Sequence, residues 1–283
     1  MLKLISNKTL SVDVQEHLNK VQEEINTGKI TADKAWSNRT NNQSFIEIKQ
    51  FLLEMTVGDG YCNYCEEHKA RDIEHIHPKA IYPHLAFDWN NYLLACPYCN
   101  SDVKRSQTAI FESPESSKVV EIKTVREPNP NEDFVFINPR IDDPFDFIAL
   151  DIRKGIFFEK GNEGTRPYER ANYTIKVLNL NIGLEKKRIE SVEYFFQKLN
   201  YAVKVYKSSS NEDLADAIND YEPFISVDDN VDVNVNKLKF LSDIKNAILN
   251  ARHATVWHEI KIQYQQSGRF KKLFDEFEEA LKW

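Results

Sequence analysis

The chain has 283 residues, a length that suits one large domain or two modest ones with a substantial core. Hydrophobic residues make up 41% and charged residues 29%, ordinary values for a soluble globular protein, and no run of 18 apolar residues is present to cross a membrane. The net charge of −7 argues against a protein that coats nucleic acid non-specifically, because phosphate neutralisation dominates such binding. The first residues do not predict a secretory signal.

An amphipathic helix is predicted over residues 12–27 and ended by Gly28. Its apolar residues recur at intervals of three and four, as on one helix face: Val14, Leu18, Val21 and Ile25. Residues 30–43 connect this helix to the next, with a polar run, NRTNNQS, that predicts a loop. A second helix is predicted from Ser44, which forms a capping-box pattern with Glu47 ahead of an apolar run.

All four cysteines of the chain occur as two C-x2-C pairs separated by 30 residues: Cys62, Cys65, Cys96 and Cys99. Thiolates three residues apart in a tight turn can both face one ion, and two such turns complete a tetrahedral set of four sulfurs. The pattern therefore predicts a closed structural zinc site. Thiolates that must stay reduced to hold zinc indicate the cytoplasm.

The segment EHIHPK, residues 74–79, lies between the two cysteine pairs. It places a carboxylate, Glu74, next to a histidine, and the surrounding residues 71–76 predict a strand. On a regular strand Glu74 and His75 point to opposite faces, whereas His75 and His77 share one face. Spacing alone therefore does not bring Glu74 and His75 to a single substrate. After the second pair, Cys99 is expected to open a helix.

These residues resemble the HNH nucleases, whose ββα-metal finger is often held by two C-x2-C pairs. The motif positions occur in the family's order: Glu74-His75, then Asn91 before Cys96, then Asn100 after Cys99, and Lys104 in a C-x2-C-[HN]-x3-K ending. A wider pattern over roughly residues 35–190 resembles the Septu-type HNH effectors of bacterial anti-phage systems, which also accompany some retrons. It includes AWSNR, CNYCE, EHIHPK, NPRIDDP and TIKVLNLN.

The resemblance implies metal-dependent hydrolysis of DNA by an effector subunit that works with an ATPase partner. It makes His75 the general base and gives Asn91 the task of orienting the loop or the imidazole. It also makes Glu74 and Asn100 the ligands of one catalytic Mg2+ or Mn2+ ion. Possible phosphate contacts are His77, Lys79 and Lys104, for which packed or solvated side chains are the alternative. The chain has no G-x4-G-K-[ST] motif, so ATP dependence requires another chain.

Two other functions are compatible with the same residues. A nuclease with this finger could act on RNA, for example tRNA, because a metal ion and a histidine do not distinguish the sugar. The alternative from another class is a zinc-stabilised module that binds nucleic acid or protein without cleaving it. Metal-dependent nicking by the pure protein separates the module from either enzyme.

The rest of the chain divides into a β-rich part and a helical part. Strand-like runs occur over residues 118–124 and, between turns, over residues 134–158, which predicts a small antiparallel sheet beside the finger. Further on, Phe-rich apolar stripes with helical spacing predict a bundle that docks a partner, with an acidic loop at 226–234. The predicted fold is α+β and predominantly helical, in four regions: an N-terminal helical segment (1–57), the HNH finger (58–110), the β-rich region (111–164) and a C-terminal helical, partner-docking region (165–283).

Overall fold

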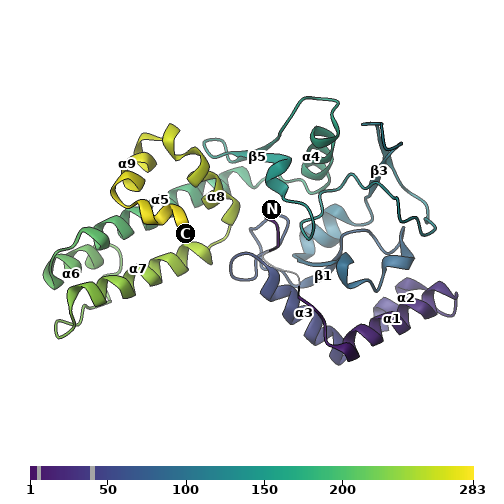
Figure 1. Ribbon diagram of the computed structural model, residues 1–283, viewed down its shortest axis with the longest axis horizontal. Coiled ribbons are helices and arrows are strands. Elements are labelled where there is room, and N and C mark those ends of the chain that lie inside the picture. Colours follow the sequence, from purple (N-terminus) through teal and green to yellow (C-terminus); the bar gives the residue numbers. More distant parts are fainter. Residues whose placement is uncertain (5–7, 39–41) are drawn as a thin grey trace. The chain divides into compact units, whose positions relative to one another are not determined.

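The computed structural model of the protein describes residues 1–4, 8–38 and 42–283. The chain forms two compact units: Met1–Asp151 with Ile156–Leu184, and Ile152–Gly155 with Glu185–Trp283. Figure 1 shows the elements of both units. As predicted, the fold is α+β and predominantly helical, and its strands form small antiparallel sheets. No helix in the described ranges is long and apolar enough to cross a membrane.

The first unit begins with three helices: α1 (Val12–Asn26), α2 (Ala32–Ser37) and α3 (Gln43–Met55). α1 confirms the predicted helix, and Gly28 follows it with a positive φ of 73°. α2 lies in the connecting segment 30–43, where no helix was predicted. The side chain of Thr31 caps α2 by accepting a hydrogen bond from the N–H of Lys34 at 3.3 Å, and the helix buries Trp36. Part of the polar run after α2 lies outside the described residues.

α3 begins with a cap other than the predicted capping box. The side-chain oxygen of Asn42 accepts a hydrogen bond from the N–H of Ser44 at 2.9 Å. Glu47 does not return to its own helix: its two carboxylate oxygens accept from the N–H and the hydroxyl of Ser11 at 3.0 and 3.1 Å. Since Ser11 immediately precedes α1, Glu47 ties the start of α1 to α3.

An antiparallel hairpin follows, in which β1 (Asp72–His75) pairs with β2 (Tyr92–Ala95). This confirms the strand predicted for residues 71–76. A short helix of π type, η4 (Tyr98–Lys104), begins within the second cysteine pair and completes a ββα order. One face of the hairpin closes a hydrophobic core with α1, α2 and α3, to which Leu18, Ile48 and Leu94 contribute fully buried side chains.

Two further hairpins complete the β structure of the first unit: β3 (Ala109–Phe111) with β4 (Val119–Glu121), and β5 (Ile148–Asp151) with β6 (Ile156–Glu159). The small antiparallel sheet predicted within residues 134–158 is present as the β5–β6 hairpin, and residues 134–137 pair elsewhere. Phe134 forms an isolated bridge to Ile110, and the N–H of Ile137 donates to the hydroxyl of Thr174 at 3.0 Å instead of to a strand. Thr174 belongs to α4 (Arg166–Val177), which also packs on β6, so α4 groups with the finger.

The second unit is a helical bundle, as predicted. Its helices are α5 (Glu185–Lys207), α6 (Asn211–Asn219), α7 (Val233–Leu249), α8 (Ala254–Gln263) and α9 (Gly268–Glu276). α5 and α7 lie side by side along their length (Figure 1). The apolar stripes form the core of this unit, where Leu199, Ile248, Phe270 and Phe274 are buried. The acidic loop ends at Asp232, which caps α7 by accepting from the N–H of Asn234 at 2.9 Å.

Short 3-10 segments occur in both units, at Pro83–Leu85, Trp89–Asn91, Pro144–Asp146, Tyr264–Gln266 and Glu278–Lys282.

Candidate active site and metal centre

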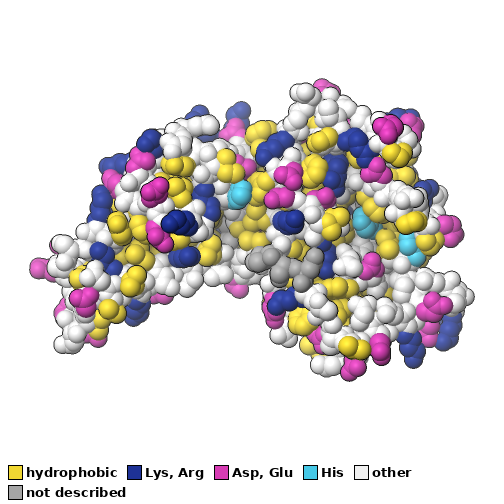
Figure 2. Space-filling model, in the orientation of Figure 1, with side chains coloured by type: hydrophobic (Ala, Val, Ile, Leu, Met, Phe, Trp, Pro, Cys, Tyr) yellow, Lys and Arg dark blue, Asp and Glu magenta, His cyan; other side chains and the backbone are white. Residues whose placement is uncertain are grey.

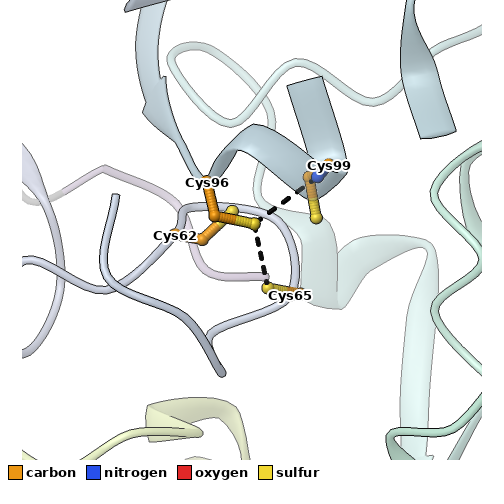
Figure 3. A group of neighbouring side chains, drawn as sticks. All are labelled: Cys62, Cys65, Cys96 and Cys99. Atoms are coloured by element: carbon orange, nitrogen blue, oxygen red, sulfur yellow. Dashed lines mark hydrogen bonds between the residues drawn. The ribbon is translucent and has the colours of Figure 1, made fainter. Parts of the chain in front are cut away.

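Two tight turns bring the four cysteines to one point, as Figure 3 shows. All four are buried, and their sulfur atoms lie within 4.8 Å of one another. Cys62 and Cys65 come from the turn before β1, which Glu66 closes with a positive φ of 59°. Cys96 follows β2 and Cys99 lies in the first turn of η4, where its N–H donates to the sulfur of Cys96 at 3.4 Å.

The environment of these sulfurs favours a bound cation. Burial raises the pKa of the Cys62 thiol, and hydrogen bonds from the other cysteines, Cys62 first, raise that of Cys99. Hydrogen bonds with Cys62 lower the pKa of Cys65 and Cys96. Four thiolates at this spacing repel one another unless a cation neutralises them, and the soft tetrahedral donor set fits a structural zinc ion. Such an ion has no open position, so any chemistry lies elsewhere in the finger.

β1 separates the two residues of the Glu74-His75 pair, because neighbours on a strand point to opposite faces. Glu74 faces η4, and its Oε1 lies 2.6 Å from Nζ of Lys104. His75 faces the helices that precede the finger, and its ring centroid lies 4.2 Å from that of Trp36. The divergence expected from strand geometry is therefore present, and a substrate touching both residues would have to reach around the end of the strand.

The imidazole of His75 is held in one tautomer. Its Nε2 lies 2.9 Å from the carbonyl oxygen of Ala86, which also accepts a hydrogen bond from the hydroxyl of Tyr92 at 2.7 Å. Since a carbonyl can only accept, Nε2 carries a proton, and in the neutral form of the ring the lone pair is on Nδ1. The side chain is buried, with Trp36 over its ring. A general base requires this neutral form, with a defined basic nitrogen.

Oxygen-bearing side chains gather on the opposite face of β1. Nδ2 of Asn100, from η4, donates to Oδ2 of Asp72 at 3.1 Å. Asp72 and Glu74 are two positions apart on the strand and so share this face. Carboxylate and amide oxygens are the donors that hard divalent cations prefer, so Glu74 and Asn100 are of the type that holds a magnesium-type ion, with Asp72 bound to Asn100 beside them.

Lys104 is fully buried beside these oxygens. Its Nζ donates to the carbonyl oxygen of His75 at 2.8 Å in addition to its ion pair with Glu74. Burial raises the pKa of the Glu74 carboxyl, and the charge of Lys104 opposes that rise. In this arrangement Lys104 does not reach solvent. The other candidate lysine, Lys79, forms an ion pair with Asp33 at 2.6 Å near the surface.

Asn91 is buried and binds the loop between the two strands through both ends of its amide. Its Oδ1 accepts from the N–H of His77 at 2.7 Å, and its Nδ2 donates to the carbonyl oxygens of His77 and Leu85, each at 2.9 Å. Leu85 immediately precedes Ala86, whose carbonyl contacts His75. Asn91 thus acts on the imidazole of His75 indirectly, by holding the loop that contacts it.

His77 does not share a face with His75, because β1 ends at His75 and the side chain of Asn91 binds the N–H of His77 beyond the strand. Its ring stacks on Phe134 with 3.6 Å between centroids. Its Nδ1 is buried and has no hydrogen-bond partner in the described part of the chain. The ring lines a cavity of about 400 Å³ together with Phe136, Arg166 and Arg170, among others. Burial lowers the pKa of His77 to about 3.

We expect the buried His77 to make the protein acid-sensitive. The pKa of His77 is lower in the folded protein than the usual 6.5, so the unfolded chain takes up a proton at a higher pH than the folded protein does. The free energy of unfolding is therefore highest above pH 6.5 and decreases as the pH falls toward 3. The loss is about 2 kcal/mol between pH 7 and pH 5. His77→Phe keeps the stack on Phe134 but cannot ionise, so its melting temperature should fall less over this range in calorimetry. Equal falls in both proteins would contradict the assignment.

Several contacts of the site were not expected from the sequence. Trp36, which packs on the ring of His75, belongs to α2, a helix that the sequence did not predict. The hydrogen bond between His75 and the backbone carbonyl of Ala86 could not be predicted from residue types. Asp72 has a usable signal: it stands two positions before Glu74 on a predicted strand, and therefore on the same face. The structure pairs Glu74 with Lys104 and Asn100 with Asp72, and it places His75, His77 and Lys79 in three other surroundings.

Comparison with known proteins gives two matches. Residues 62–106 match the family model of the HNH endonucleases. The chain is also similar to the Septu protein PtuB of Bacillus thuringiensis, with 43% identity over 58 residues. That alignment covers 19% of this chain and 22% of the relative, so the likeness concerns a segment of each protein. Residues 62–106 are therefore similar to an HNH endonuclease domain, and a segment of the chain is similar to a Septu protein.

Proposed function

We propose that the protein is a metal-dependent endonuclease that hydrolyses DNA as the effector of a bacterial anti-phage defence complex. The observation that carries the proposal is the match of residues 62–106 to the HNH endonucleases. The geometry agrees with it, because the same residues form a cysteine cluster suited to zinc and place Asn100 on the face of β1 that carries Glu74. Similarity to a Septu protein supports the role in defence. A thiolate-held zinc suits the reducing cytoplasm.

Within this proposal His75 is the general base. Nδ1 accepts the proton of the attacking water, and the carbonyl of Ala86 stabilises the imidazolium that forms, because it accepts the hydrogen bond from Nε2. Asn91 keeps that carbonyl in place through Leu85. Glu74 and Asn100 would hold a Mg2+ or Mn2+ ion, which would supply charge stabilisation for the phosphate and the leaving oxygen.

An ATPase partner is the second part of the proposal. The relative is a Septu protein, and the resemblance to Septu-type effectors implies an ATPase partner. The present sequence carries no phosphate-binding loop of the P-loop type. The partner would also supply part of the grip on nucleic acid, because the net charge of −7 is unfavourable for binding phosphates. Figure 2 shows acidic and basic side chains interspersed over the face that it draws. On α7, Val235 and Leu238 are exposed and offer apolar surface for docking.

The proposal is tested by incubating the full-length protein, alone and with proteins that co-purify from its native host, with supercoiled plasmid and with tRNA. We expect nicking of the plasmid in Mg2+ or Mn2+, none in EDTA, and stimulation by ATP only when the partner is present. Cleavage of tRNA but not of plasmid would assign RNA as the substrate. Failure to cleave either substrate with the partner present would favour a non-catalytic zinc module.

A further inference from the structure

Asp72 connects β1 to η4 through the side chain of Asn100. Its Oδ2 accepts a hydrogen bond from Nδ2 of Asn100 at 3.1 Å. A carboxylate has no hydrogen to donate, so the amide nitrogen must face Asp72 and the amide oxygen must face away from it. The orientation of the Asn100 amide therefore follows from the chemistry of its partner.

We propose that Asp72 is a positioning residue of the divalent-metal site, an inference that rests on the proposed function. The oxygen of an amide binds hard cations, whereas its NH2 group does not. By holding Nδ2, Asp72 keeps Oδ1 of Asn100 available to the ion. If Asp72 is removed, the amide can rotate by 180° and present its nitrogen to the site.

The charges around the site give Asp72 a second effect. Glu74 forms an ion pair with the buried Lys104, so this pair together with the neutral Asn100 amounts to no net charge. Asp72 is half-buried on the same strand face and adds one negative charge. A divalent cation binds more tightly where the nearby charge is negative, so Asp72 supplies attraction that the Glu74–Lys104 pair does not.

Binding of Mn2+ to the full-length, zinc-loaded protein tests the inference without a cleavage assay. Titration followed by electron paramagnetic resonance reports free Mn2+ and gives the dissociation constant. We expect Asp72→Ala to weaken Mn2+ binding about tenfold or more, the usual effect of removing a partner that orients a metal ligand. The matched control is Asp59→Ala in the same finger, where Asp59 is exposed and pairs with Lys69; its Mn2+ affinity should equal that of the wild type.

An exchanged pair separates positioning from simple structural support. In the double variant Asp72→Asn/Asn100→Asp, the amide at position 72 donates to the carboxylate at position 100, so the hydrogen bond and the total charge are both kept. We expect its Mn2+ affinity to recover to within about threefold of the wild type, with zinc content unchanged in every variant. Wild-type affinity in Asp72→Ala, or no recovery in the exchanged pair, would overturn the inference. If the wild type itself binds no Mn2+, the proposed metal site falls and the inference falls with it.

Discussion

Cys96→Ser should unfold the protein and release its zinc. A serine hydroxyl does not replace a thiolate as a zinc ligand, and structural zinc contributes on the order of 10 kcal/mol in small sites. That figure is comparable to the whole stability of a typical domain, which is about 5–15 kcal/mol. The four cysteines are buried and their turns hold both the start of β1 and the start of η4, so loss of the ion should disorder the candidate site as well.

Zinc content by mass spectrometry and the melting curve by circular dichroism check this prediction. The control is Tyr98→Ala, because Tyr98 lies in the same turn as Cys96 and Cys99 but is 42% exposed and is not a ligand. The control should bind one zinc ion per chain and melt near the wild-type temperature. Cys96→Ser protein that is well folded and free of zinc would show that the cluster does not need the metal.

His75→Gln should lower cleavage by about 10²-fold or more while zinc content stays at one ion per chain. Positioned acid/base groups contribute on this scale, and an amide cannot take the proton that Nδ1 of His75 accepts. Glutamine is chosen because its NH2 group can still donate to the Ala86 carbonyl, whereas alanine would leave a cavity under Trp36. Plasmid nicking in Mg2+ and in Mn2+ gives the rates, and thermal melting reports the fold.

His77→Phe provides the comparison, since the two histidines are two residues apart but lie in different surroundings. Its activity should stay within a few-fold of the wild type. If His77→Phe is inactive and His75→Gln retains full activity, the general base has been misassigned, and the histidine that lines the cavity with Arg166 and Arg170 takes its place.

Local patterns in the sequence determined the parts of this protein that depend on spacing. The two C-x2-C pairs predicted the cysteine cluster, because each pair needs only one tight turn to bring its two sulfurs together. Helical periodicity predicted α1, α5 and α7, because a continuous apolar stripe can be buried in one way only. Strand alternation correctly separated Glu74 from His75.

Contacts between distant segments were decided by the tertiary structure. α2 is stabilised by the packing of Trp36 against His75, Phe45 and Phe87. These partners lie outside residues 30–43, so the local sequence pattern does not predict the contacts. Glu47 does not form the predicted capping box and instead accepts a hydrogen bond from Ser11, which lies 36 residues away in the sequence. Asn100 donates a hydrogen bond to Asp72, which lies 28 residues away in the sequence. The partner of such a side chain depends on which residues are adjacent to it in the folded protein. A buried polar group must be satisfied by whatever partner lies within reach, so its role is fixed only once the chain has folded around it.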